Sequence, residues 1–344
     1  MRRWKAFTLA AALVVAAAGG YAAYWVVTAR ILEGVVTNWA EAQRAHGYKV
    51  EIGEPRVQGF PVAFRMRFEA PVIEAPPEAG GWRWQGAPLT AEAAITNPWQ
   101  IRFAAPGHHV LTAPLAGGLA DWEADAREAE GWVHLEPGGG LEEAGIGISG
   151  LDLRLPGGGM LGVAATHLSV DPRRGPPDRP QEEDLAVRLT IEGLELPGAG
   201  PAGLGHRLAR LHLDALVRGA LPPGPAAEAL QAWRDAGGVL EVRRLATEWG
   251  DLRVTTDGTL SLDKRMQPTA AGVATIRGLD AVIDDLAEAS VIGAQEARLA
   301  ALASAALTKP ASDGDREVRL PISIQERTVF LGPLRLFRLP EIHW

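Results

Sequence analysis

The chain has 344 residues, of which 34 are Lys or Arg and 42 are Asp or Glu, so its formal net charge is −8. This acidic balance argues against a general nucleic-acid-binding protein, because such proteins present a basic face to the phosphate backbone. The absence of cysteine excludes disulfides, thiolate metal sites, iron–sulfur clusters and cysteine nucleophiles. A hydrophobic content of 47% is typical of a folded protein, and 40 glycines and 25 prolines predict many turns rather than a long helical bundle.

The N-terminus has the pattern of a membrane anchor. A basic tail at residues 1–6 precedes an uncharged apolar run at 7–27. These 21 residues would span about 30 Å as a helix, which is the thickness of the hydrocarbon core of a bilayer. Because basic flanks stay in the cytoplasm, the sequence predicts a single-pass protein of the bacterial inner membrane with its bulk in the periplasm. The alternative is a cleaved signal peptide that ends at the small residues 16–18, which would also export the bulk of the chain.

The helical pattern continues beyond the anchor. Apolar residues recur at helical spacing from Ile31 to Trp39, with charged and polar residues between them, and Gly47 provides a stop signal. The sequence therefore predicts an amphipathic helix at 28–47 whose apolar stripe packs on the folded domain. The other interpretation places this stripe on the membrane surface, but the polar face carries charges of both signs rather than basic residues alone.

Beyond residue 48 apolar and polar residues mostly alternate, which predicts half-buried strands. The clearest alternation is at 62–69, 99–103, 151–155, 185–192, 211–213 and 318–325. One apolar face per strand favours antiparallel pairing, because parallel strands are usually buried on both faces. The predicted fold class is α+β, mostly β, with a large curved antiparallel sheet over 48–344 and a few helices that cover its apolar face.

Local signals predict where this sheet is interrupted. Asp257-Gly258 lies between two short alternating runs and predicts a tight hairpin turn, because such turns need a positive φ. Helices are predicted at 226–236, 279–289 and 294–307, whereas 115–130 fits either a helix or a strand. The segment 171–184 is charged, rich in proline and without an apolar residue. It is interpreted either as a linker between two lobes, 48–170 and 185–344, or as a long loop of one continuous sheet.

Motifs for catalysis or cofactor binding are scarce. Residues 145–150 match G-x-G-x-x-G, but a strand-like segment follows where a dinucleotide site needs a helix, so a turn or a bulge is the expected role. His108 and His109 are adjacent and would point to opposite faces of a strand, which disfavours chelation of one ion. Nucleophile-elbow, phosphate-loop and zinc-protease motifs are not present in the sequence. We therefore expect no enzyme activity, no cofactor and no metal site.

Four aromatic residues are the candidate ligand-binding face. Trp82 and Trp84 are two residues apart, which places both indoles on one side of a strand, and Trp99 and Phe103 can share such a face. Core packing is the simpler interpretation of these side chains. They also suit a groove for an apolar ligand or an acyl chain.

Several short motifs along the chain together resemble an uncharacterised proteobacterial family, the domain of unknown function 2125. They include the basic start, the anchor and the helix that contains Leu32, Trp39 and Gly47, followed by PRVQGFP at 55–61, WRW at 82–84, APG at 105–107, WG at 249–250, GTLSLD at 258–263, LP at 320–321 and LGP at 331–333. This resemblance implies no established activity and no catalytic residues. The GTLSLD strand is also similar to segments of AsmA-like envelope proteins, which are anchored, periplasmic and associated with lipid transport or envelope maintenance, an analogy of architecture only.

Together these features predict a non-enzymatic envelope protein. Its expected partners are the lipid bilayer, through 7–27, and a lipid or another apolar envelope component; a nucleic acid is not expected. One alternative is a scaffold that binds other envelope proteins by strand addition at a sheet edge. Another is a periplasmic hydrolase, which would need a pocket with two close carboxylates of perturbed pKa.

Overall fold

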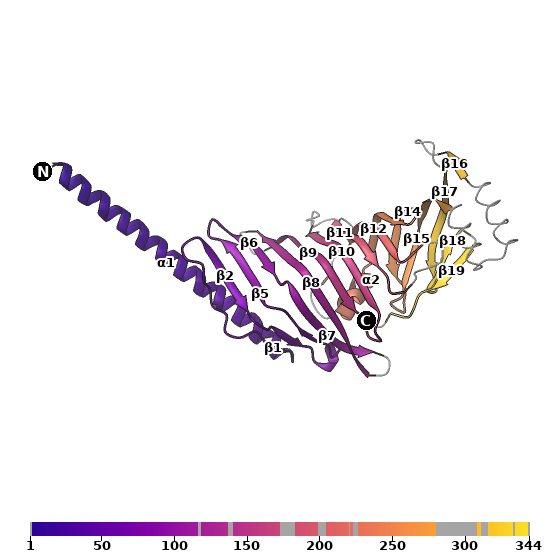
Figure 1. Cartoon of the computed structure of the whole chain (residues 1–344), viewed down its shortest axis with the longest axis horizontal. Helices are drawn as coiled ribbons and strands as arrows, with labels where there is room; N and C mark the ends of the chain where they lie inside the picture. The colour runs from indigo at the N-terminus through magenta and orange to yellow at the C-terminus, as the bar shows by residue number, and fades with distance from the viewer. Residues whose placement is uncertain are drawn as a thin grey trace. The chain divides into compact units, whose positions relative to one another are not determined.

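The structure is a computed structural model that describes residues 2–115, 118–136, 140–172, 183–198, 204–219, 221–222, 226–279, 308–310, 316–332 and 334–342. The chain divides into two compact units, one of residues 1–124 and 128–140 and the other of residues 125–127 and 141–344. Antiparallel strands form most of both units (Figure 1), which confirms the predicted fold class. The predicted helices 279–289 and 294–307 lie, after residue 279, outside the described residues.

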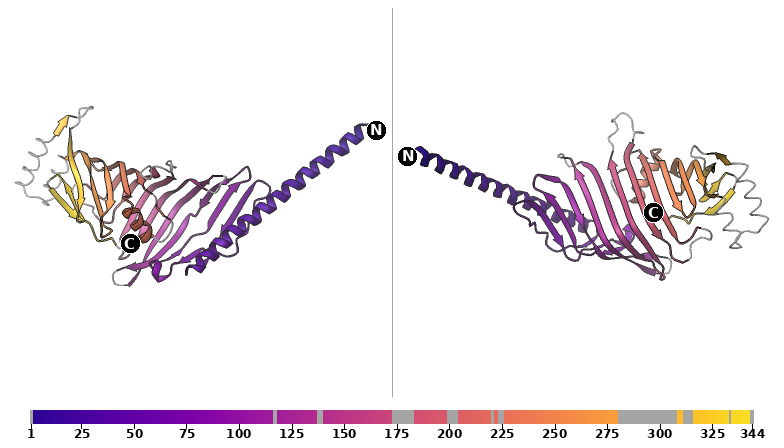
Figure 2. Two further views of the ribbon diagram at one scale, coloured as in Figure 1. Left: turned by 180° about the vertical axis from the view of Figure 1, so that it is seen from behind. Right: turned by 45° about the horizontal axis from the view of Figure 1, so that its top comes forward.

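Helix α1 (Arg2–Ala45) is continuous through the predicted anchor and the predicted amphipathic helix. It ends as expected at Gly47, where φ is 86° and the N–H of Tyr48 donates to the carbonyl of Gln43 at 3.1 Å. Its side chains are exposed on all sides at 13–20, whereas one side of the helix packs on the first unit from Tyr21 onward (Figure 2). The described segment Leu13–Ala45 is long and apolar enough to cross a membrane.

The first unit contains two antiparallel ladders beside α1. One ladder joins β1 (Lys49–Glu51), β3 (Val72–Glu74), β4 (Arg83–Gln85) and β7 (Gly107–Leu115). The other joins β2 (Ala63–Phe68), β5 (Leu89–Ala94), β6 (Asn97–Ala104) and β8 (Gly118–Leu135). The ambiguous segment 115–130 is therefore mainly strand in its described part.

In the second unit each strand pairs mainly with the next along the chain. The order is β9 (Leu141–Arg154), β10 (Met160–Pro172), β11 (Glu183–Glu195), β12 (Arg207–Arg218), β13 (Val239–Trp249), β14 (Leu252–Leu262), β15 (Pro268–Arg277), β17 (Arg316–Gln325), β18 (Thr328–Leu331) and β19 (Leu334–Arg338), with β16 (Thr308–Pro310) also paired to β17. Helix α2 (Ala226–Asp235) lies between β12 and β13 in the sequence, as the pattern at 226–236 predicts. The polar face carries cross-strand ion pairs, such as Arg210 with Glu192 at 3.3 Å.

The division between the two units falls near residue 140, whereas the candidate linker 171–184 lies within the second unit. The strands on either side of this segment, β10 and β11, pair with each other from Pro172↔Leu185 to Gly162↔Glu195. The segment therefore connects neighbouring strands of one unit. The G-x-G-x-x-G run at 145–150 lies inside β9, and its last glycine, Gly150, has a φ of 59°.

The predicted hairpin turn at Asp257-Gly258 is wrong. Strand β14 runs straight through both residues, and Gly258 lies opposite Gly272 of β15. A Cβ atom at Gly258 would lie 2.4 Å from the carbonyl oxygen of Ala271 and 2.6 Å from the Cα of Gly272. Glycine is needed here for a close approach of two strands, and this requirement leaves the same local sequence signal as a tight turn.

This close approach predicts that Gly258→Ala destabilises the second unit. We expect a loss of about 1 to 3 kcal/mol in the free energy of unfolding, because the added methyl group must push β14 away from β15. Urea denaturation followed by circular dichroism would measure the loss. Gly162→Ala in β10 is the matched control, since its Cβ would meet its nearest neighbour, the Cβ of Glu195, at an ordinary 3.5 Å. Equal stability of the two variants would contradict this account.

Candidate functional site: an apolar cavity beside helix α1

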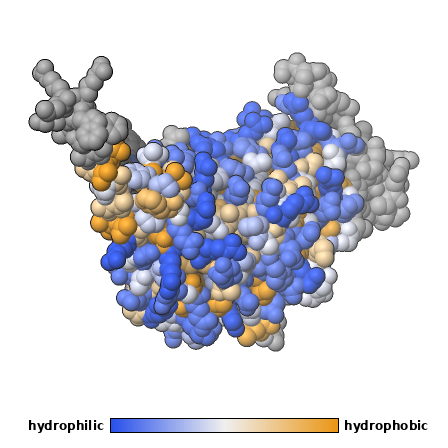
Figure 3. All heavy atoms as spheres, turned by 60° about the vertical axis from the view of Figure 1, so that its left-hand side comes forward, coloured by the Kyte–Doolittle hydropathy of each residue, from blue (hydrophilic) through white to orange (hydrophobic). Residues whose placement is uncertain are grey.

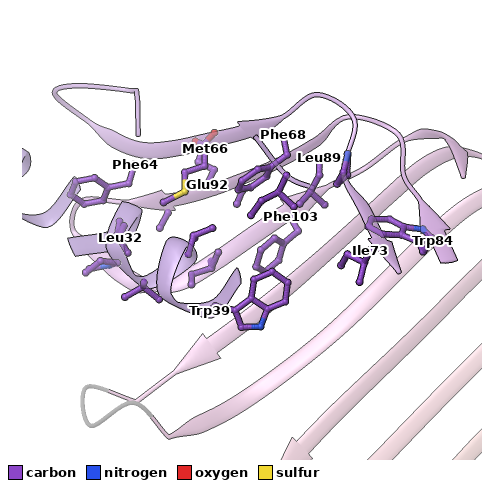
Figure 4. Close-up of a pocket in the computed structure, with 18 residues that line it drawn as sticks. Leu32, Trp39, Phe64, Met66, Phe68, Ile73, Trp84, Leu89, Glu92 and Phe103 are labelled. Atoms are coloured by element: carbon purple, nitrogen blue, oxygen red, sulfur yellow. The ribbon is translucent and has the colours of Figure 1, made fainter. Parts of the chain in front are cut away.

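A cavity of about 500 Å³ lies in the first unit between helix α1 and the strands (Figure 4). This volume is within the range of small-molecule binding pockets. Its lining is almost entirely apolar and comes from α1, strands β2 to β6 and the segments that join them. The lining residues are Leu32, Val35, Val36, Trp39, Ile52, Phe64, Met66, Phe68, Pro71, Ile73, Trp84, Leu89, Ala91, Glu92, Ala93, Pro98, Ile101 and Phe103.

Helix α1 forms one wall of the cavity. Leu32, Val35, Val36 and Trp39 line it, and their spacing of three and four residues places them on one helix face. These residues belong to the apolar stripe noted in the sequence. The stripe borders the domain but is only partly covered by it, since Ile31 and Val35 are each 59% exposed and Trp39 is 45% exposed. Figure 4 shows Leu32 and Trp39 directed from α1 toward the side chains of the strands.

The opposite wall comes from three paired strands, β2, β5 and β6. In β2 the lining residues alternate with exposed arginines, as the sequence pattern predicts. Across the sheet Met66 pairs with Ala91, and Ala91 pairs with Phe103. The small alanine side chains on the central strand leave open the space between the bulky side chains on its two neighbours. This row of large, small and large residues accounts for a cavity where a filled core would otherwise form.

The cavity contains little polarity. Glu92 is the charged residue in its lining, and its carboxylate forms an ion pair with Arg65 at 2.6 Å on the exposed side of the strands.

Other charged groups lie outside the cavity. A hydrogen bond to Glu54 and the negative charge of that carboxylate raise the pKa of Arg56 above its ordinary value. Among the described residues, no group of three or more His, Asp or Glu side chains could hold a metal ion. The arrangement suits an apolar ligand without charge.

Two of the four predicted site residues line the cavity and two do not. Trp84 and Phe103 belong to the lining. Trp84 stacks on His109 with ring centroids 6.0 Å apart. Trp82 precedes strand β4 and its ring lies 6.3 Å from that of Tyr48. Trp99 remains 42% exposed, because the register of β5 and β6 shifts between Ala93 and Ala94 and the alternation that positions Phe103 does not extend to Trp99.

Sequence reasoning missed most of the cavity wall. The apolar face of β2 was visible as alternation, but the pattern does not tell whether a filled core or a cavity lies against it. The cross-strand partners decide this, and Ala91 and Ala93 were unremarkable in the sequence. The helical stripe from Leu32 to Trp39 was the available signal that a second wall existed.

The fold and the cavity together define a β-rich protein whose N-terminal helix is long enough and apolar enough to span a membrane. The chain belongs to the DUF2125 family, which is described as an uncharacterized protein conserved in bacteria and whose model matches residues 25–340. The resemblance inferred from the short motifs is thereby confirmed. The matched region begins in α1 at Trp25, where the helix first becomes buried against the domain. No curated protein and no solved structure matches the chain.

Proposed function

We propose that this protein is anchored in the bacterial inner membrane by α1, with its bulk in the periplasm, and that it binds a lipid or another apolar envelope component in the cavity. In this proposal it acts by binding and without catalysis. The observation that carries the proposal is the continuity of α1. The helix that leaves the apolar run at 7–27 becomes a wall of an apolar cavity five residues later, at Leu32.

Two further observations support this function. An acyl chain needs an apolar site of ligand size, and the cavity has an almost entirely apolar lining and a volume in that range. The basic tail at 1–6 supports the orientation, because positively charged flanks remain on the cytoplasmic side.

The test uses the full chain in lipid nanodiscs that contain a phospholipid with a photoactivatable group near the end of one acyl chain. After irradiation, adducts are located by peptide mass spectrometry. We expect adducts at the cavity-lining residues Met66, Phe68 and Phe103 in addition to those on the anchor. Adducts confined to the anchor would count against the proposal.

Filling the cavity provides the decisive variant. In Ala91→Trp the indole would occupy the space between Met66 and Phe103 that an acyl chain would otherwise fill. Adducts at the cavity-lining residues should therefore fall about tenfold or more, which corresponds to a loss of at least about 1.4 kcal/mol in binding free energy. Adducts on the anchor should not change. The matched control is Leu119→Trp, at a 72% exposed position of β8 outside the cavity, which should leave both sets of adducts unchanged.

A further inference from the structure

Three uncharged segments meet where α1 reaches the first unit. In the helix no charged residue occurs from Ala6 to Ala29. The loop before β2 has none at 57–64, and the β5–β6 hairpin has none at 93–101. Figure 3 shows apolar residues gathered on the face of the molecule next to the N-terminal helix.

These segments are in direct contact. The ring of Phe60 lies 6.3 Å from that of Tyr21 and 5.5 Å from that of Trp25. The hairpin is attached to the loop, because the N–H of Ile95 donates to the carbonyl of Val62 at 3.3 Å. The loop and the hairpin therefore lie at the level of the helix turn that contains Tyr21 and Trp25.

The length of the apolar run fixes this level relative to a bilayer. Tyr21 begins the last seven residues of the run at 7–27, which correspond to about 10 Å of helix. The residues before Tyr21 would cover only about 20 Å, which is less than the roughly 30 Å of a hydrocarbon core. If 7–27 spans the membrane, Tyr21 and Trp25 lie in the outer part of the hydrocarbon core. The loop around Phe60 then lies close to the boundary between acyl chains and headgroups, where tyrosine and tryptophan are enriched.

The backbone of this loop suits an environment with little water. The carbonyl of Gly59 accepts from the N–H groups of Val62 and Ala63, at 3.1 and 3.0 Å. The carbonyl of Pro61 accepts from the hydroxyl of Tyr21, and that of Ala63 accepts from the indole of Trp25 at 3.1 Å. Polar backbone groups near lipid must find partners within the protein, and these three carbonyls do. The side chains of the same loop point outward instead, with Phe60 56% and Val62 70% exposed.

We propose that the loop at 59–62, together with Trp99 of the hairpin, inserts into the interface of the bilayer and forms a second membrane contact beside the anchor. Trp99, 42% exposed and outside the cavity, then has the role of an interfacial aromatic residue. The occupant of this surface is the lipid bilayer, because the surface is continuous with the end of the membrane-spanning run. The inference rests on the anchor of the proposed function but not on the cavity.

The chain has no cysteine, so a single nitroxide label can be placed at any position without removing native thiols. The test uses full-length Val62→Cys in nanodiscs of phosphatidylcholine and phosphatidylglycerol. Collision rates of the label with oxygen, which partitions into lipid, and with a water-soluble nickel chelate report its depth. Leu119→Cys is the matched control, because Leu119 is an exposed leucine of the same unit, 72% exposed and far from α1 in sequence. Val14→Cys, 66% exposed on the helix, provides the value for the membrane interior.

We expect the ratio of oxygen to nickel collisions at Val62 to lie several-fold above that at Leu119 and toward that at Val14. A ratio equal to that at Leu119 would place the loop in water and overturn the inference. Shielding from both reagents, or dipolar broadening between labels, would overturn it in favour of a contact with protein, such as a second copy of the chain. The two proposals can fail separately. If the label at position 62 has the high collision ratio of a lipid environment but no acyl adducts form in the cavity, the membrane contact is supported and the cavity ligand is not.

Discussion

Trp25→Ala is expected to detach helix α1 from the loop at 57–64 and to cost about 3 to 5 kcal/mol of local stability, as truncations of buried aromatic residues do. Trp25 is 9% exposed and forms one cluster with Ala29 and Phe64. Its ring stacks on that of Phe64 at 5.6 Å, and its indole N–H donates to the carbonyl of Ala63 at 3.1 Å. The variant therefore loses packing and leaves a carbonyl without its partner.

Hydrogen–deuterium exchange of the full chain in nanodiscs measures this effect, because the amides of Val62 and Ala63 report opening of the loop. Trp25→Phe separates the two causes, since it keeps most of the ring packing and loses only the hydrogen bond, with an expected cost of about 1 kcal/mol. Tyr24→Ala, at a 49% exposed position of the same helix, is the control for a change of aromatic content. Unchanged exchange in Trp25→Ala would show that α1 is held to the domain by other contacts, such as the Glu33 carboxylate that accepts from the N–H of Val57 at 2.8 Å.

The second large effect is expected for Trp233→Ala in the second unit. Trp233 is 4% exposed. It and Ala229 are the buried residues of α2. Its indole N–H donates to the carbonyl of Arg218 at 2.9 Å at the end of β12. We expect a loss of about 3 to 5 kcal/mol, measured as faster amide exchange in β12 and β13, because the truncation leaves a cavity and removes a hydrogen bond.

The surroundings of Trp233 provide a second route to the same result. A Cβ atom at Gly238 would lie 2.3 Å from the indole ring, so Gly238→Ala should also displace Trp233. Gln231→Ala changes an exposed residue of the same helix and should alter exchange little, by less than about 0.5 kcal/mol. Equal exchange in Trp233→Ala and Gln231→Ala would contradict the role given to the indole.

Particular elements show which expectations depended on local patterns. The alternation at 62–69 and at 185–192 predicted β2 and β11, because a strand with one buried face imposes a period of two on its own sequence. The helix at 226–236 was predicted from the residues that bound it in the sequence, Pro225 on one side and Gly237-Gly238 on the other. The predicted hairpin turn at Asp257-Gly258 was wrong. A single sequence does not distinguish a glycine that a neighbouring strand requires from a glycine that a turn requires.

The candidate site was predicted only in part for a related reason. Trp84 and Phe103 line the cavity, but the register shift next to Ala94 removes Trp99 from that face, and no local pattern marks such a shift. The stripe from Leu32 to Trp39 was visible, but not the strands against which it would lie. A cavity wall is a property of several segments at once, whereas periodicity describes one segment at a time.

The sequence by itself determined the apolar N-terminal helix, its continuation as an amphipathic helix, the dominance of antiparallel strands and the family. Each of these follows from the period, charge or length of a single segment, or from short motifs along the chain. Only the tertiary structure decided that Ala91 and Ala93 leave a cavity between larger neighbours and that Phe60 contacts Tyr21 and Trp25. These features depend on strand register and on contacts between residues almost forty positions apart, which the pattern within each segment does not constrain.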